Sequence, residues 1–93
     1  MIYVDRYPDW IVAGKPKWKD GGHLFGTDLN ELHAFAEQLG LKRDWYQGKQ
    51  FPHYDLTKNK RRMAIENGAT QLAPGVIPED VIRHDPNSRY FGS

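Results

Sequence analysis

The sequence contains no cysteine, which excludes disulfide bonds, thiolate metal sites and cysteine nucleophiles. It also lacks any apolar run long enough to span a bilayer. The first residues, Met1 to Asp5, reach a charge too soon for a secretory signal peptide. The net charge is only +1, so a general attraction to nucleic acids is excluded as well. We therefore expect a cytoplasmic protein with no membrane partner, in which any anion site is a local cluster of basic residues.

The length of 93 residues suits one small domain with one modest core. Hydrophobic residues make up 39% of the chain and aromatic residues 13%, which is typical of a folded protein. We expect a single α/β domain over residues 1–84 and a C-terminal tail over residues 85–93.

Two segments have the pattern of helices. In the first, Thr27 to Leu39, Asp28 and Glu31 have the spacing of an N-terminal capping box, and Gly40 is a typical C-terminal stop. The apolar face of this helix consists of Leu29, Leu32, Phe35, Ala36 and Leu39. The second predicted helix runs from about Thr57 to Asn67.

Short runs that favour strands surround these helices. They are residues 2–4, 23–25, 44–47 and 69–72. Residues 76–83 are compatible with a strand or a short helix. The alternation predicts an α/β fold, with a short mixed or parallel sheet flanked by two main helices. Such sheets bind ligands beyond the carboxyl ends of their strands, where we expect Asp5, the residues after Phe25 and the start of each helix.

The start of the second helix carries its charges at the unfavourable end. Its first turns contain four cations: Lys58, Lys60, Arg61 and Arg62. The helix macrodipole already places partial positive charge there, so these residues do not help the helix. Free backbone N–H groups together with cations form a good anion site, and phosphate is the common biological anion. The alternative is that the four side chains extend into solvent.

His53 and Asp55 are the best acid–base candidates. In an extended segment their side chains share one side, whereas at a helix entry Asp55, or else Thr57, would be the cap. The functional interpretation is a histidine that works beside a carboxylate, next to a phosphate site. The alternative is that Asp55 only caps the helix and His53 only contacts the ligand or the backbone.

Asp5, His23 and His33 are the next polar candidates. Asp5 ends a strand, where a carboxylate can bind a ribose hydroxyl or a metal-bound water, or can instead form a turn or a salt bridge. His33 borders the apolar face of the first helix, which favours a buried histidine with its hydrogen bonds satisfied. His23 follows two glycines, which allow close approach to a ligand or form an ordinary turn. His23, His33, His53 and Asp55 offer metal ligands, but no compact pair such as His-x3-His exists, so we predict no metal site.

The segment from Trp10 to Lys19 alternates aromatic residues with lysines. Aromatic rings stack on bases and lysines neutralise phosphates, so this segment, including Trp18, is compatible with a lid over a nucleotide. Equally, Trp10 can fill the core while the lysines are solvated. For Trp45, core packing is the favoured interpretation. The chain has no GxGxxG motif, Walker loop, serine elbow or kinase signature.

Several segments stand in a recognisable order: Tyr3-Val4-Asp5, His23-Leu24, Asp28, Glu31-Leu32-His33-Ala34-Phe35-Ala36, Leu39-Gly40-Leu41, Trp45-Tyr46-Gln47, His53-Tyr54-Asp55-Leu56, Arg62, Ala64 and Gly68-Ala69. In combination they resemble the DUF4031 family, a group of short bacterial and phage proteins named for having no known function. The resemblance covers roughly residues 2–70. It implies no assigned reaction, but it makes a phage source plausible.

We interpret the chain as a homo-oligomeric module that binds a phosphate-bearing nucleotide or a nucleotide-derived small molecule, without a cofactor. The expected ligand contacts are Asp5, Trp18, His23, His53, Asp55, Lys58, Arg61 and Arg62. If the source is a phage, the sharper hypothesis is an anti-defence sponge that sequesters a nucleotide immune signal in the host cytoplasm. That version rests on the family resemblance and the size of the chain.

Two other classes of function stay open. One is a small phosphoesterase or nuclease in which His53 and Asp55 are catalytic and Arg62 stabilises charge. The other is a protein-binding inhibitor whose exposed aromatic residues form hot spots. Turnover of the ligand distinguishes the enzyme from the binding module.

Overall fold

Five strands pair into one mixed sheet in a computed structural model that describes residues 1–48, 51–73, 76–83 and 85. The strands are β1 (Ile2–Val4), β2 (Gly22–Gly26), β3 (Tyr46–Gln47), β4 (His53–Leu56) and β5 (Thr70–Gln71). Their order across the sheet is β3-β4-β2-β1-β5. β1 and β5 are parallel, and the other neighbouring pairs are antiparallel. The predicted α/β fold with a small mixed sheet is therefore confirmed.

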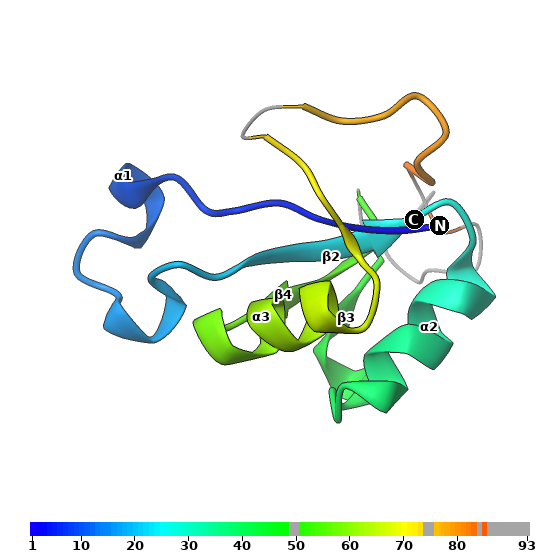
Figure 1. The fold of residues 1–93 in the computed structure, drawn as a ribbon, viewed down its shortest axis with the longest axis horizontal. Coiled ribbons are helices and arrows are strands. Elements are labelled where there is room, and N and C mark those ends of the chain that lie inside the picture. Colours follow the sequence, from blue (N-terminus) through cyan, green and yellow to red (C-terminus); the bar gives the residue numbers. More distant parts are fainter. Residues whose placement is uncertain (49–50, 74–75, 84, 86–93) are drawn as a thin grey trace, which may run out of the picture.

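The two expected main helices lie on the same face of this sheet (Figure 1). The helical elements are α1 (Asp9–Val12), α2 (Leu29–Gln38), α3 (Lys58–Glu66) and the 3-10 turns η1 (Pro16–Trp18) and η2 (Arg43–Trp45). α1 and η1 lie together at one end of the molecule, beyond the sheet, and residues 76–83 pass over the side opposite α2 and α3 (Figure 1).

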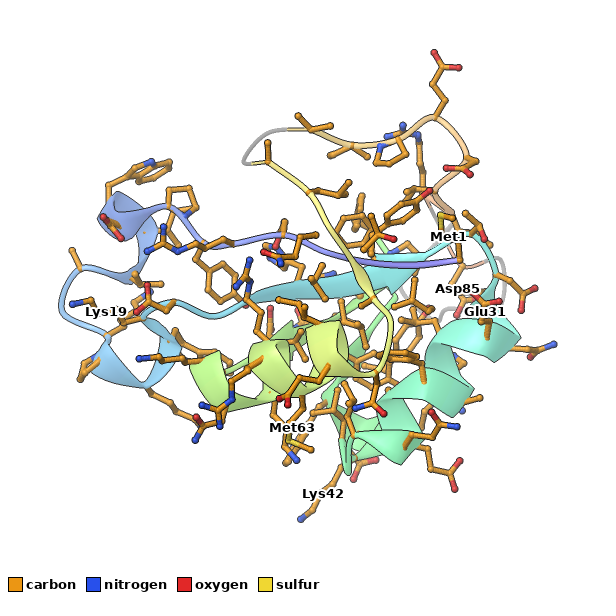
Figure 2. The ribbon with its side chains drawn as sticks, in the orientation of Figure 1. Met1, Lys19, Glu31, Lys42, Met63 and Asp85 are labelled. Atoms are coloured by element: carbon orange, nitrogen blue, oxygen red, sulfur yellow. The ribbon has the colours of Figure 1, made fainter. Side chains whose placement is uncertain are left out.

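Both main helices begin and end where the sequence predicts. The Asp28 side chain accepts a hydrogen bond from the backbone N–H of Glu31 at 2.8 Å and so caps α2. At its start α2 also receives the amino group of Met1, which pairs with the Glu31 carboxylate (Figure 2). Gly40 follows α2 and Gly68 follows α3, and both adopt the positive φ that favours glycine at this position.

The two faces of the sheet are covered differently. The main core lies between the sheet and the helices α2 and α3, and it contains Ile2, Val4, Leu24, Leu32, Ala36, Leu39, Leu41, Tyr54, Leu56, Ala64 and Ala69. On the opposite face, Tyr3 and Phe25 pack against Val81 in a smaller apolar cluster. Because side chains alternate along a strand, the rest of that face is formed by the polar residues of β2 and β4.

The direction of β2 corrects one expectation. β2 is antiparallel to β1, so Val4 pairs with Leu24 and Ile2 pairs with Gly26. The carboxyl ends of β1 and β2 therefore point to opposite ends of the sheet. The residues after Phe25 do not join Asp5, as an all-parallel order would require; the beginning of β2 does.

For two further segments the sequence left two alternatives open. The structure selects one for the first segment and neither for the second. Residues 53–56 are extended, so Thr57 and not Asp55 caps α3, accepting a hydrogen bond from the backbone N–H of Lys60 at 3.4 Å. Residues 76–83 form neither of the expected elements, strand or helix, but contain a turn at residues 79–80.

The expected tail, residues 85–93, lies outside the described residues except for Asp85. Asp85 is buried, and its carboxylate accepts a hydrogen bond of 2.9 Å from the Tyr46 hydroxyl. Asp85 therefore contacts the β3 end of the sheet. In the part of the chain that the structure describes, no helix has the length and apolar character needed to cross a membrane.

The apolar face of α2 generates a stability prediction. Leu32 is fully buried, so Leu32→Ala should lower the free energy of unfolding by about 2–5 kcal/mol, a large share of a small domain's stability. Phe35 is only partly buried against the core, so Phe35→Ala should also destabilise, toward the lower end of that range. Chemical denaturation measures both effects.

The control for this prediction is Glu37→Ala, an exposed position on the same helix. This change should alter the free energy of unfolding by no more than about 0.5 kcal/mol. A denaturation midpoint for Leu32→Ala equal to that of the wild type would show that Leu32 is not part of the core.

Candidate functional site

Four predicted site residues meet on the polar part of the sheet face that the main helices leave uncovered. Asp5 follows β1, His23 lies in β2, and His53 and Asp55 lie in β4. His23 and Asp55 are register partners across β2 and β4. His53 and Asp55 share a face because β4 is extended, while the intervening side chain is buried in the core. We call His23, His53 and Asp55 the His–Asp cluster.

Asp5 holds His23 in place. One carboxylate oxygen accepts the backbone N–H of His23 at 2.6 Å, and the other lies 2.9 Å from the Nδ1 atom of the same residue. This contact requires close approach of the chains, since a Cβ atom on Gly22 would lie 2.1 Å from the carbonyl oxygen of Asp5. The glycine pair at the start of β2, Gly21 and Gly22, thus lets the neighbouring backbones approach closely, and Asp5 positions the imidazole of His23.

The imidazoles of His23 and His53 both face the Asp55 carboxylate. The Nε2 atom of His53 lies 3.6 Å from Asp55 Oδ1, and the Nε2 atom of His23 lies 3.9 Å from the same oxygen. The two rings are edge to face, with centroids 4.9 Å apart. Both distances to Oδ1 exceed the usual length of a hydrogen bond, so the three groups surround a small space.

Two residues that the sequence analysis missed complete the surroundings of Asp55. The Tyr7 hydroxyl donates to Oδ1 at 2.7 Å, and the Gln47 side-chain amide donates to Oδ2 at 2.5 Å. Gln47 pairs with His53 across β3 and β4, so recognising that pairing would have found it. No signal in the sequence singles out Tyr7, because it lies in an irregular segment far from Asp55 along the chain.

The charges in this site perturb one another. The neighbouring His53 side chain lowers the pKa of Asp55 to about 2, and the Tyr7 hydrogen bond acts in the same direction against the effect of burial. Burial lowers the pKa of His53, but the Asp55 carboxylate and the Phe51 carbonyl outweigh it, so the pKa is raised overall. Burial, followed by the Asp55 carboxylate, raises the pKa of Tyr7. Asp55 therefore stays ionised at neutral pH.

His33 lies apart from the His–Asp cluster. Its Nδ1 atom is 2.7 Å from the Tyr54 hydroxyl, and Tyr54 belongs to the core on the helix side of the sheet. Burial, followed by the positive charge of Arg43, lowers the pKa of His33. The predicted histidine with a satisfied hydrogen bond is present, although it is only half-buried.

The cations at the start of α3 have different surroundings. Lys60 donates to the carbonyl of Leu39 at the end of α2, and Arg61 Nε donates to the carbonyl of Asp5 at 2.8 Å. Arg62 is exposed and lies 3.8 Å from the Glu66 carboxylate, one turn along the helix. Lys58 is exposed. Lys60 and Arg61 thus stabilise the fold through backbone carbonyls.

Two neighbouring cavities open near this face, and Asp55 of the His–Asp cluster lines one of them. The larger, about 850 Å³, is lined by Trp18, Trp45 and Asp55 among others, and we call it the tryptophan cavity. The smaller, about 370 Å³, is lined by Pro16, Lys17, Lys19, Asp20, Thr57, Lys58 and Asn59, and we call it the lysine cavity. Both share Lys17 and Thr57. Neither Arg61 nor Arg62 lines either of them.

The tryptophans are more exposed than a core requires. Trp10 is 78% exposed, so it does not fill the core, and the expected core packing of Trp45 is wrong because that residue is 48% exposed. Trp18 is half-buried and meets Tyr7 edge to face, with ring centroids 6.3 Å apart. Lys17 lies over the Trp18 ring, 5.1 Å from its centroid. Trp18 and Trp45 therefore present aromatic surface to the tryptophan cavity.

The lowered pKa of Asp55 predicts a pH dependence of stability. Its pKa is about 2 in the fold against an ordinary 3.8, so the folded state binds this proton less readily than the unfolded state. The stabilisation is complete above the unfolded value and is lost as the pH falls from about 4 to about 2. Its size is roughly 2 kcal/mol. Denaturation of the wild type and of Asp55→Asn should show a difference in stability that narrows over that range. A difference independent of pH would contradict the assignment.

Among the comparisons with known proteins, the family profile alone finds a match. A family profile described as a protein of unknown function, DUF4031, matches residues 2–80. No curated protein and no solved structure matches the chain. The matched range includes the strands and helices of the described residues and every residue of the His–Asp cluster. The chain therefore belongs to the DUF4031 family.

Proposed function

We propose that this protein binds a phosphate-bearing nucleotide or a nucleotide-derived small molecule across the tryptophan and lysine cavities. The observation that supports the proposal most directly is the adjacency of the two cavities. One offers aromatic surface, the other offers cations, and they share Lys17 and Thr57. A nucleotide has the matching parts, a flat base and a charged phosphate, a short distance apart.

The tryptophan cavity suits the base. Its volume of about 850 Å³ is within the range that small-molecule sites in proteins usually have. Trp18 and Trp45 both line it and are both partly exposed. Stacking of a base on an aromatic side chain contributes about 1–3 kcal/mol and does not require a particular base.

The lysine cavity suits the phosphate. Lys17, Lys19 and Lys58 line it, and so do Thr57 and Asn59 at the N-terminus of α3. The first backbone N–H groups of a helix have no partner within the helix and carry partial positive charge. Lys19 extends from the end of the molecule formed by α1 and η1 (Figure 2). Lysines from the η1 region and from α3 would thus surround the same anion.

A sponge that sequesters a host immune nucleotide is the sharper form of this proposal. A phage source would favour it, and binding without turnover is all that it requires. We also propose that the protein assembles as a homo-oligomer, because a chain of this size encloses a ligand poorly by itself.

A second candidate, a phosphoesterase, is favoured by one specific observation. Asp55 both lines the tryptophan cavity and faces the Nε2 atom of His53 at 3.6 Å. An acid–base pair would therefore stand beside the tryptophan cavity, which adjoins the proposed phosphate site.

The lysine cavity predicts which cations matter for binding. Lys58→Ala and Lys17→Ala should each weaken binding of ADP or ATP by about 1–2 kcal/mol, roughly 5–30-fold in Kd, because each removes a charged contact with phosphate. Arg62→Ala is the matched control: it is a cation one turn further along α3, paired with Glu66 and outside both cavities. Isothermal titration calorimetry at fixed salt measures all three. An equal loss for Arg62→Ala, or no loss for Lys58→Ala, would remove the phosphate site from the lysine cavity.

Turnover separates the binding module from the phosphoesterase. We expect heat to release any co-purified nucleotide unchanged, as mass spectrometry would detect. In the enzyme, excess nucleotide would be converted over many cycles in the presence of Mg²⁺ or Mn²⁺, and His53→Ala would slow this by about 10²–10⁴-fold. Repeated turnover that is abolished by His53→Ala would establish the second candidate over the first.

A further inference from the structure

We propose that the His–Asp cluster binds a divalent transition-metal ion through His23 Nε2, His53 Nε2 and one oxygen of Asp55. The three ligand atoms lie within 4.8 Å of one another, and no other such group occurs in the part of the chain that the structure describes. The proposal concerns the ion alone and does not rest on the nucleotide function proposed above.

The protonation pattern of both imidazoles is set by their outer partners. A carboxylate can only accept, so the Nδ1 atom of His23 carries the proton that bonds to Asp5. A backbone carbonyl can only accept, so Nδ1 of His53 carries the proton that bonds to the carbonyl of Phe51. In each neutral ring, Nε2 is then left with its lone pair. Both lone pairs belong to the nitrogens that face Asp55.

The distances suit an ion better than they suit direct hydrogen bonds. The Nε2 atoms of His53 and His23 are 3.6 and 3.9 Å from Asp55 Oδ1, whereas an N–H···O bond is about 2.7–3.2 Å long. Around a tetrahedral ion with bonds of about 2.0–2.1 Å, neighbouring ligand atoms are about 3.3 Å apart. The two distances to Asp55 Oδ1 need to shorten by only a few tenths of an ångström, and the remaining pair of ligand atoms starts within 4.8 Å.

The groups behind the ligands have the arrangement found around metal sites. A histidine ligand almost always donates its other ring N–H to a carboxylate or a carbonyl. This hydrogen bond fixes the orientation of the ring and makes the coordinating nitrogen more basic. His23 does so to Asp5, and His53 does so to Phe51. Asp55 accepts from Tyr7 and Gln47, one bond on each oxygen. Because each carboxylate oxygen has two acceptor positions, Asp55 keeps one for the ion.

The ligand types select the class of ion. Two imidazoles and one carboxylate suit Zn²⁺ and other first-row divalent ions, whereas Mg²⁺ and Ca²⁺ prefer oxygen ligands. Three protein ligands leave at least one coordination position for water or for an oxygen of a bound molecule. Asp55 also lines the tryptophan cavity, so that position would lie at the cavity wall.

The test is a titration of the chelator-treated wild-type protein with Zn²⁺ alone. We expect one ion to bind per chain. His23→Gln and His53→Gln should each weaken binding at least tenfold, because each removes a direct ligand. The matched control is His33→Gln, which changes a half-buried histidine bonded to Tyr54 outside the cluster and should leave the Kd unchanged. Circular dichroism melts establish that the variants are folded.

Asp5→Asn tests whether the hydrogen bond from His23 to Asp5 contributes to metal binding. It removes a group that touches His23 but not the ion, and it should weaken Zn²⁺ binding by about 10–100-fold. With Co²⁺ as the probe, the visible absorption spectrum should change in Asp5→Asn and remain unchanged in His33→Gln. A merely structural effect of Asp5→Asn would lower the melting temperature without altering the Co²⁺ spectrum, and it would count against a positioning role.

A measurement on the unaltered protein keeps the proposal falsifiable if the variants do not fold. In long-range ¹H–¹⁵N spectra, Zn²⁺ should move the Nε2 resonances of His23 and His53 and leave those of His33 in place. Three results would overturn the proposal: binding of Zn²⁺ and Co²⁺ weaker than about 1 mM, unchanged affinity in both cluster variants, or Zn²⁺ shifts at His33 instead. Loss of nucleotide binding would not affect any of these readouts.

Discussion

The position of β2 between β1 and β4 is the constraint on which the rest of the structure depends. Its pairings set Asp5 beside His23 on one side and Asp55 opposite His23 on the other. The entry to β2 is so tight that a Cβ atom at Gly21 would lie 2.1 Å from the Leu56 carbonyl oxygen in β4, and one at Gly22 would lie 2.1 Å from the carbonyl oxygen of Asp5, just after β1. The same alternation that turns these polar groups outward turns Leu24 and its neighbours into the main core. One central strand therefore organises both the core and the candidate site.

The cations at the start of α3 have two different roles, which the sequence does not distinguish. Lys60 and Arg61 use their charges on backbone carbonyls at the ends of α2 and β1. Lys58, in the same turn of α3, faces the lysine cavity with Lys17. The excess of cations at this helix start is thus partly structural, although Lys60 also lines the tryptophan cavity. Of the His–Asp cluster, Asp55 lines the adjoining tryptophan cavity.

Local signals predicted the helices well because caps and stops act within a few residues. Asp28 and Gly40 mark the ends of α2 as the sequence indicated, and Thr57, one of the two caps it offered, begins α3. Strand direction is different, because a short apolar run reads equally well in a parallel and an antiparallel pair. That ambiguity misplaced the residues after Phe25 and hid the contact between Asp5 and His23. The sequence therefore identified candidate residues one by one. It did not show which of them lie together, because that depends on pairings between distant parts of the chain.

The cationic start of α3 also bears on how the protein folds. A nine-residue helix is short enough to be marginal in isolation, and its first-turn charges oppose its dipole. What stabilises this start is contact with carbonyls that lie far away in the sequence, at Leu39 and Asp5. We therefore expect α3 to form when it docks on the sheet, after β1 and α2 are in place, and not as an early nucleus. Its amide hydrogens should then exchange with solvent together with those of β1, as one cooperative unit.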